Sequence, residues 1–106
     1  SNNLNINKFN YKNCLIIKNV LSKHIKHDLK IKRPNDILFK QHKICGILQE
    51  TIFYKNLKYL LVGIGLNILK SPKFKNYKTT SMYEITNKKV NRLKILNEIK
   101  LSYETI

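Results

Sequence analysis

The sequence has few acidic residues, and this gives it a strong excess of positive charge. Only 6 Asp and Glu stand against 21 Lys and Arg, so the 106 residues carry a formal net charge of +15. A chain this basic attracts polyanions, among which nucleic acid is the usual candidate. The cations are nevertheless spread along the whole chain, and Lys, Asn and Ile are residue types that an A+T-rich genome favours. The charge alone therefore leaves open a nucleic-acid-binding protein and an ordinary solvated surface.

The sequence also lacks a long apolar run and a metal-binding arrangement of cysteines. Its longest apolar stretch, residues 59–69, is broken by glycines and is shorter than the ~20 residues that cross a membrane. Residues 1–10 have no continuous apolar centre, so we expect no signal peptide, no membrane association and a cytoplasmic location. Cys14 and Cys45 are far apart and form no CxxC spacing, which predicts reduced, buried thiols and argues against a zinc site.

The apolar residues that are present indicate two long helices in one small domain. With 42% hydrophobic and 25% charged residues, the composition is that of a globular chain. We expect residues 1–10 to be frayed and a helix to start at about Asn13. Its apolar face has helical spacing and comprises Ile17, Val20, Leu21 and Ile25. A final helix from about Asn91 has apolar residues at spacings of three and four, namely Leu93, Leu96, Ile99, Tyr103 and Ile106.

Between these helices the pattern indicates strands. Residues 29–32 alternate between apolar and basic types, and Pro34 must end that strand because it donates no ladder hydrogen bond. Residues 37–39, 44–54 and 59–69 are rich in β-branched and aromatic types, with a hairpin turn at Asn56. Residues 70–80 form a basic loop, and Thr80 or Ser81 caps a short helical turn. The fold class is therefore α+β, with a mixed, mostly antiparallel sheet flanked by helices and the last two strands at its centre.

Two motifs place polar side chains at strand ends. In the first, Pro34 fixes its own φ, so that Asn35 and Asp36 lie on a rigid corner where a carboxylate could hold a metal ion or a reacting group. The same tetrapeptide would also suit a plain Asx turn. In the second, KICGIL, Lys43 precedes a strand that Gly46 interrupts. A glycine inside a strand marks a bulge or a close approach to the backbone, and the lysine could attract an anion lying there.

A third motif, GIGLN, repeats the pattern of a glycine-containing strand. Gly63 and Gly65 are alternate residues, so both leave one face of the strand without a side chain, and Asn67 ends that same face. The spacing lacks the third glycine of the dinucleotide fingerprint, and no Walker lysine follows. A planar ring or a thin chain could lie on this face, although a closely packed helix would explain the glycines as well.

The three motifs in this order resemble the catalytic domain of biotin protein ligases, the biotin-[acetyl-CoA-carboxylase] ligase family. That family typically has K-W-P-N-D, then K-[ILV]-[AGC]-G-I-L, then G-[IA]-G-[IL]-N at similar separations, and a T-S-L stretch that TTSMYEI at 79–85 resembles. The resemblance runs over roughly residues 13–105 and implies part of a catalytic domain with a class II aminoacyl-tRNA-synthetase-like fold. Its members activate biotin with Mg-ATP to biotinyl-5′-AMP and transfer the biotin to a lysine of a biotin carboxyl carrier domain.

The resemblance also implies roles for single residues. Lys43 matches the lysine that contacts the biotin carboxylate and the α-phosphate, and Asp36 matches an aspartate implicated in catalysis, through magnesium or the acceptor lysine. Asn35 and Asn67 match asparagines at the nucleotide end. The ligand would pack against the matching glycines, which are Gly46, Gly63 and Gly65.

Two departures from the family pattern qualify these expectations. Arg33 stands where the family usually has tryptophan, and no G-R-G-R-x-G-R segment occurs in the 106 residues. We therefore expect the isolated chain neither to bind biotin tightly nor to make the adenylate. The alternatives are a related lipoate ligase, a small basic nucleic-acid-binding module with aromatic residues on its glycine strands, and a split or decayed gene product.

Overall fold

The computed structural model describes the backbone of residues 2–105 and the side chains of residues 9–105. In chain order the elements are α1 (Asn2–Ser22), β1 (Lys30–Lys32), β2 (Asp36–Phe39), β3 (His42–Tyr54), β4 (Leu57–Leu66), α2 (Met82–Thr86) and α3 (Arg92–Glu104). The strands form one sheet in the order β1-β2-β3-β4, and every neighbouring pair is antiparallel. A single parallel bridge joins Lys43 to Thr79. The predicted α+β class with a mostly antiparallel sheet is confirmed.

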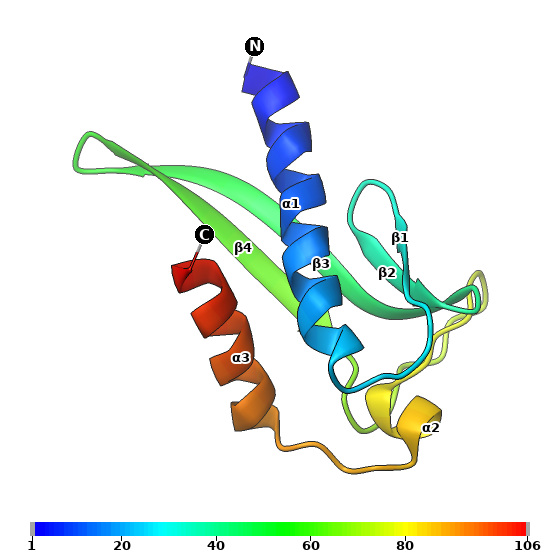
Figure 1. Ribbon diagram of the computed structural model, residues 1–106. Coiled ribbons are helices and arrows are strands. Elements are labelled where there is room, and N and C mark those ends of the chain that lie inside the picture. Colours follow the sequence, from blue (N-terminus) through cyan, green and yellow to red (C-terminus); the bar gives the residue numbers. More distant parts are fainter. Residues whose placement is uncertain (1, 106) are drawn as a thin grey trace.

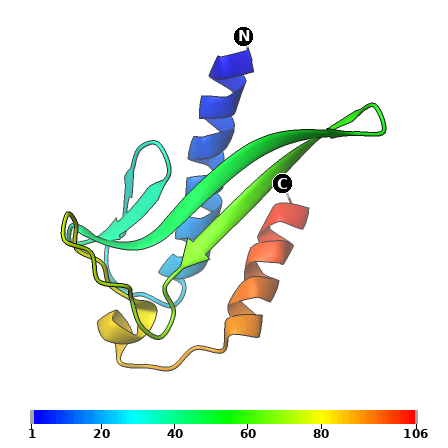
Figure 2. The same ribbon diagram turned by 180° about the vertical axis from the view of Figure 1, so that it is seen from behind.

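The β2–β3 and β3–β4 hairpins each close through a two-residue turn. Lys40 and Gln41 have φ values of 45° and 67°, and Lys55 and Asn56 have φ values of 48° and 65°. Two successive left-handed residues match the twist of the flanking strands, which favours tight hairpins. The turn predicted at Asn56 is confirmed. Residues 48–63, where β3 and β4 pair only with each other, project from the rest of the sheet as a long exposed arm (Figures 1 and 2).

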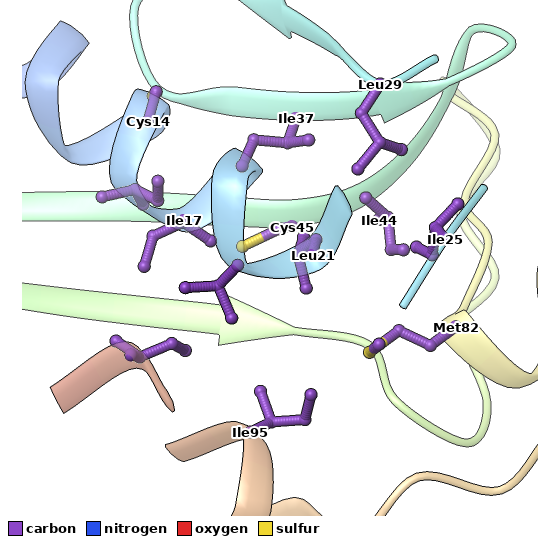
Figure 3. Close-up of a cluster of buried hydrophobic side chains, with 13 residues drawn as sticks. Cys14, Ile17, Leu21, Ile25, Leu29, Ile37, Ile44, Cys45, Met82 and Ile95 are labelled. Carbon is purple, nitrogen blue, oxygen red and sulfur yellow. The ribbon is translucent and has the colours of Figure 1, made fainter. Parts of the chain in front are cut away.

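Helices α1 and α3 lie on one face of the sheet, and Figure 2 shows no helix on the opposite face. The apolar stripe predicted for the first helix faces inward, where Ile17 and Leu21 are fully buried. Figure 3 shows these side chains against Ile37 and Cys45 of the sheet, with Ile95 of α3 closing the cluster from another side. None of the described helices is long and apolar enough to span a membrane.

The boundaries of two elements, α1 and β4, differ most from the predictions. Helix α1 already begins at Asn2, within the segment that was expected to be frayed, while Ser1 lies outside the described residues. Strand β4 starts before Tyr59 and ends at Leu66. The backbone N–H of the next residue, Asn67, still donates to the Ile44 carbonyl of β3. β4 is also an edge strand of the described sheet and not one of its central strands.

Helix α3 begins where the sequence predicts but faces the core with a different side. Asn91 caps it by accepting hydrogen bonds from the backbone N–H groups of Leu93 and Lys94. The buried residues are Ile95 and Ile99, whereas Leu93 and Leu96 are exposed and line an apolar groove beside β4. Of the apolar residues that the sequence analysis names for this helix, Ile99 is buried and Tyr103 packs against the core, so only part of that set faces inward. Ile106 lies outside the described residues.

Candidate active site

The rigid corner of residues 33–35 joins β1 to β2 and is fastened to the central strand β3. The carbonyl of Asn35 accepts a hydrogen bond from the backbone N–H of Ile47 at 2.8 Å. Arg33 places its guanidinium carbon 4.5 Å from the centre of the Tyr11 ring on α1. This cation–π contact gives Arg33 a packing partner beside the corner. The corner is therefore held by β3 and α1, and this fixes the position at which Asp36 begins β2.

A β-bulge in β3 brings Lys43 and Gly46 to the same face of the sheet. Residues three apart in a regular strand point to opposite faces. Here Asp36 pairs with Gly46 while Leu38 pairs with Lys43, and the register shifts between these two pairs. Since Asp36 and Leu38 alternate along β2, their partners share one face. The extra residue of the bulge thus aims the lysine toward the glycine.

Lys43 and Asp36 form an ion pair over the backbone of Gly46. The Lys43 Nζ lies 3.3 Å from Asp36 Oδ1, and the two side chains are 31% and 26% exposed. A Cβ added at Gly46 would lie 3.0 Å from Lys43 Cε and 3.1 Å from its Nζ. The missing side chain of Gly46 is therefore what lets the lysine lie across the strand. The pair remains open to solvent, so a ligand could reach it.

Two open cavities meet at Lys43 and Tyr77. The first, of about 280 Å³, has the paired residues Gly46 and Gly65 in its lining. Its other lining residues are Cys45, Leu66, Asn67, Pro72, Phe74 and Thr79. The second cavity, of about 360 Å³, is also lined by Lys32, Asp36, Leu38, Gln41, Asn76 and Lys78. Lys43 therefore lies between a largely uncharged cavity and a charged one.

The loop of residues 70–80 supplies the wall that sequence reasoning missed. The backbone N–H of Lys43 donates to the carbonyl of Lys78, and the N–H of Thr80 donates to the carbonyl of Lys43, each at 2.9 Å. These bonds place the loop against the start of β3. Phe74 and Tyr77 stack with their centroids 4.7 Å apart, and Lys43 Nζ lies 5.6 Å from the Tyr77 ring centre. The sequence feature that could have indicated this wall is the pair of aromatic residues three positions apart in a lysine-rich loop.

The other residues that the sequence singled out divide into two groups. Asn67 lines the first cavity, but its Nδ2 donates to the Thr80 carbonyl at 3.1 Å, so the side chain also holds the loop in place. Gly63 and Asn35 line neither of these two cavities. A Cβ at Gly63 would meet only Leu48 atoms at 3.8 Å, which is ordinary contact. The structure thus gathers Lys43, Asp36, Gly46, Gly65 and Asn67.

The two cysteines are free, and both are buried. Burial is the main cause that raises the pKa of Cys45 to about 12, with the neighbouring Cys14 adding to the effect. Cys45 is therefore a neutral thiol near pH 7, even though it borders the first cavity. It contributes packing to the site and is not a nucleophile.

Comparison with known proteins identifies the family. Residues 8–67, more than half of the chain, match the Biotin/lipoate A/B protein ligase family. The chain belongs to this family. Among solved structures, the biotin protein ligase from Aquifex aeolicus in its apo form is 29% identical with a TM-score of 0.70. The match covers 86% of this chain and 40% of that chain. The same ligase in complex with biotin and ATP has the same identity and TM-score.

More distant members of the biotin/lipoate ligase family share the fold. Biotin protein ligase from Leishmania major, in complex with biotinyl-5-AMP, is 23% identical with a TM-score of 0.70, over 83% of this chain and 42% of that chain. LipL1 of P. falciparum, in complex with lipoate, is 24% identical with a TM-score of 0.64, over 91% of this chain and 30% of that chain. The chain spans less than half the length of these relatives.

Proposed function

We propose that this chain is part of a biotin protein ligase and carries its reactive lysine. The reaction would join biotin to ATP as biotinyl-5′-AMP and then pass the biotin to a lysine of a biotin carboxyl carrier domain. The observation that carries the proposal is the placement of Lys43, which lies over Gly46 between two cavities and is oriented by Asp36. The likeness to the A. aeolicus ligase in complex with biotin and ATP supports it.

The chemistry explains why a lysine is needed at this point. A biotin carboxylate oxygen must attack the α-phosphorus of ATP, and both groups are negatively charged. An ammonium group held between them reduces their repulsion and stabilises the charge that builds up at the phosphorus. Lys43 would supply that charge, and the glycine backbone of the first cavity would let the substrates come within its reach. The stacked Phe74 and Tyr77 rings offer an apolar wall for their organic parts.

Asp36 has two compatible roles. Its ion pair with Lys43 fixes the position of the ammonium group. The described residues contain no cluster of three or more acidic, cysteine or histidine side chains that could hold a metal ion. A single carboxylate nevertheless fits Mg²⁺, which proteins commonly bind through one or two carboxylates together with substrate phosphates. Bound there, the ion would neutralise phosphate charge, and Asp36 is the residue that would hold it.

Lipoate is the second candidate substrate, because LipL1 in complex with lipoate has the same fold. Lipoate ligation uses the same adenylate chemistry, so the position of Lys43 would serve either acid. The order of the three motifs and the identity to the A. aeolicus biotin protein ligase favour biotin. Parallel assays with biotin and lipoate would separate the two substrates.

A chimera tests the proposal directly. Residues 13–105 would replace the matching segment of the A. aeolicus biotin protein ligase, and biotin-dependent exchange of pyrophosphate into ATP would be measured. We expect exchange that falls by about 100-fold in Lys43→Ala, the usual loss when one group that stabilises transition-state charge is removed. Lys58→Ala, in the exposed arm, is the matched control and should retain the activity. A folded chimera that keeps its exchange rate in Lys43→Ala would refute the proposal. Exchange with lipoate but not with biotin would identify lipoate as the substrate.

The isolated chain should behave differently from the chimera. The G-R-G-R-x-G-R segment of the family pattern does not occur in these 106 residues. We therefore expect the chain by itself to bind biotin weakly and to show no biotin-dependent release of pyrophosphate from ATP. Turnover by the isolated chain would contradict this expectation while supporting the assignment of the active lysine.

A further inference from the structure

The second cavity carries charge that the attack of biotin on ATP does not by itself require. Three lysines border it, Lys32 from the end of β1, Lys43 from the start of β3 and Lys78 from the loop, together with one carboxylate, Asp36. Lys32 pairs directly with Asp36 across the two strands, so their side chains lie on the same face. Lys78 is held nearby through its carbonyl, which accepts from the Lys43 N–H.

The positive charge of this cavity is largely uncompensated. Lys43 has its ion pair with Asp36, whereas within residues 9–105 neither Lys32 nor Lys78 forms an ion pair. The remaining polar lining is neutral and consists of the amide side chains of Gln41 and Asn76. Clustered cations with amide donors are the groups that recognise phosphate oxygens.

The two cavities differ in charge on either side of Lys43. Apart from Lys43, every residue that lines the first cavity is uncharged. A ligand with an organic part and a polyanionic part would therefore orient with its anionic part in the second cavity. ATP has this build, and its reacting α-phosphorus must lie between the two parts, which is where Lys43 lies.

From this arrangement we infer that Lys32 and Lys78 bind the β- and γ-phosphates of ATP and retain them as the pyrophosphate leaving group. The inference rests on the proposed function. When the biotin oxygen bonds to the α-phosphorus, the bond from that phosphorus to the bridging oxygen breaks. Pyrophosphate departs with the electron pair of that bond. The two lysines are placed to stabilise the negative charge that develops there.

Titration of the isolated chain with inorganic pyrophosphate at low salt tests the inference. Amide shifts of the ¹⁵N-labelled chain report both the affinity and the location, and they show whether each variant is folded. We expect pyrophosphate to bind more tightly than orthophosphate, and Lys32→Gln and Lys78→Gln each to weaken it by about fivefold, as loss of a partly exposed charge pair does. Lys58→Gln removes the same charge from the exposed arm and should change the affinity by less than about twofold.

Two results would overturn the inference. One is pyrophosphate binding that Lys58→Gln weakens as much as Lys32→Gln does, because the effect would then come from net charge alone. The other is the absence of pyrophosphate binding at the second cavity of the folded chain.

A second titration separates this inference from the proposed function. Biotinyl-5′-AMP has no β- or γ-phosphate, so a hydrolysis-resistant analogue should keep its affinity in Lys32→Gln and lose it in Lys43→Gln. If the analogue fails to bind while pyrophosphate binding still depends on Lys32 and Lys78, the anion site is supported and the ligase function is refuted. If the analogue binds at Lys43 and the affinity for pyrophosphate is unchanged in Lys32→Gln and Lys78→Gln, the function is supported and the inference is refuted.

Discussion

Gly46 is the residue on which the position of Lys43 depends most directly. The lysine side chain runs where the Cβ of any other residue would lie, with Cε and Nζ 3.0 and 3.1 Å from that point. Those atoms are the mobile end of a flexible side chain, so they can move away at little cost. The consequence of a larger residue is therefore a displaced ammonium group and not an unfolded protein.

We predict that Gly46→Ala lowers the affinity for a biotinyl-5′-AMP analogue by about tenfold, which corresponds to ~1.4 kcal/mol. The free energy of unfolding should change by less than ~1 kcal/mol, because alanine suits a strand better than glycine. Gly63→Ala is the matched control, since its Cβ would make only ordinary contacts at 3.8 Å. Amide-shift titration and urea unfolding measure the two quantities. Equal losses of affinity in both variants would contradict this account of Gly46.

At the scale of single residues, the sequence singled out Lys43, Asp36 and Gly46, which the structure brings together, but it did not reveal their surroundings. Each motif alone also has a plain structural explanation, and only the resemblance of the three motifs in order to the biotin protein ligase family singled these residues out. The sequence offered Phe74 and Tyr77 as an aromatic pair in a lysine-rich loop, but not their position beside Lys43, because that position depends on the loop folding back through backbone bonds to β3. Backbone hydrogen bonds involve no particular side chain, so the residue types do not predict them.

Three elements are joined by one polar cluster inside the apolar layer. Asn13 of α1 is buried, and its Nδ2 donates to Gln49 Oε1 of β3 at 2.6 Å. Its Oδ1 accepts from the Tyr103 hydroxyl of α3 at 2.7 Å. A buried amide with both ends hydrogen-bonded fixes the relative position of its neighbours more narrowly than apolar contacts do. This cluster sets how α1 and α3 lie on the strand that carries the site.

We predict that Tyr103→Phe lowers the free energy of unfolding by about 1 kcal/mol at neutral pH through loss of this hydrogen bond. The pKa of Tyr103 is raised from 10.0 to about 12. Burial is the main cause, and Cys14 and Cys45 add to the shift. A raised pKa in the folded state stabilises the fold below pH 10, and this contribution is lost as the pH rises toward 12.

The difference in stability between wild type and Tyr103→Phe should therefore shrink across that pH range. Urea unfolding of both proteins at pH 8 and pH 11 measures it, and the comparison cancels the titration of the many lysines, which both proteins share. A difference that stays constant or grows with pH would show that the hydroxyl is not held as described.

At the scale of elements, patterns of apolar residues predicted the type of each element but not always its packing. The stripe of α1 was predictable because a single apolar face runs through Ile17 and Leu21. In α3 apolar residues occupy more than one face, so spacing alone could not show that Ile95 and Ile99 are the buried ones. The bulge that aims Lys43 at Gly46 depends on pairing with β2, which a strand pattern of period two does not reveal.

For the whole molecule, the main feature is an exposed apolar arm. The distal half of the β3–β4 hairpin projects away from the helices (Figure 1). Phe53 is 76% exposed there, and Tyr54, Leu57 and Leu60 are exposed as well. In this part of the hairpin β3 no longer pairs with β2, so both strands have a free edge. Exposed apolar side chains beside free strand edges promote association between chains.

We therefore predict that the isolated chain self-associates as its concentration rises, and that Phe53→Lys reduces this association. The free energy of unfolding should change by less than ~0.5 kcal/mol, as is usual for an exposed position. Leu101→Lys makes a similar change at an exposed leucine of α3 and serves as the control. Sedimentation velocity over a range of concentrations measures the effect. A wild-type chain that stays monomeric throughout would contradict the prediction.

The measurement that tests the central claim most directly is a titration of the ¹⁵N-labelled chain with a hydrolysis-resistant analogue of biotinyl-5′-AMP. Amide shifts report binding even when Kd is ~1 mM or weaker, which suits a chain that spans 40% of the A. aeolicus ligase. The account predicts shifts at Lys43, Gly46, Gly65 and Asn67, which Lys43→Gln reduces. Shifts that are absent, or that centre on the exposed arm and ignore Lys43→Gln, would contradict it.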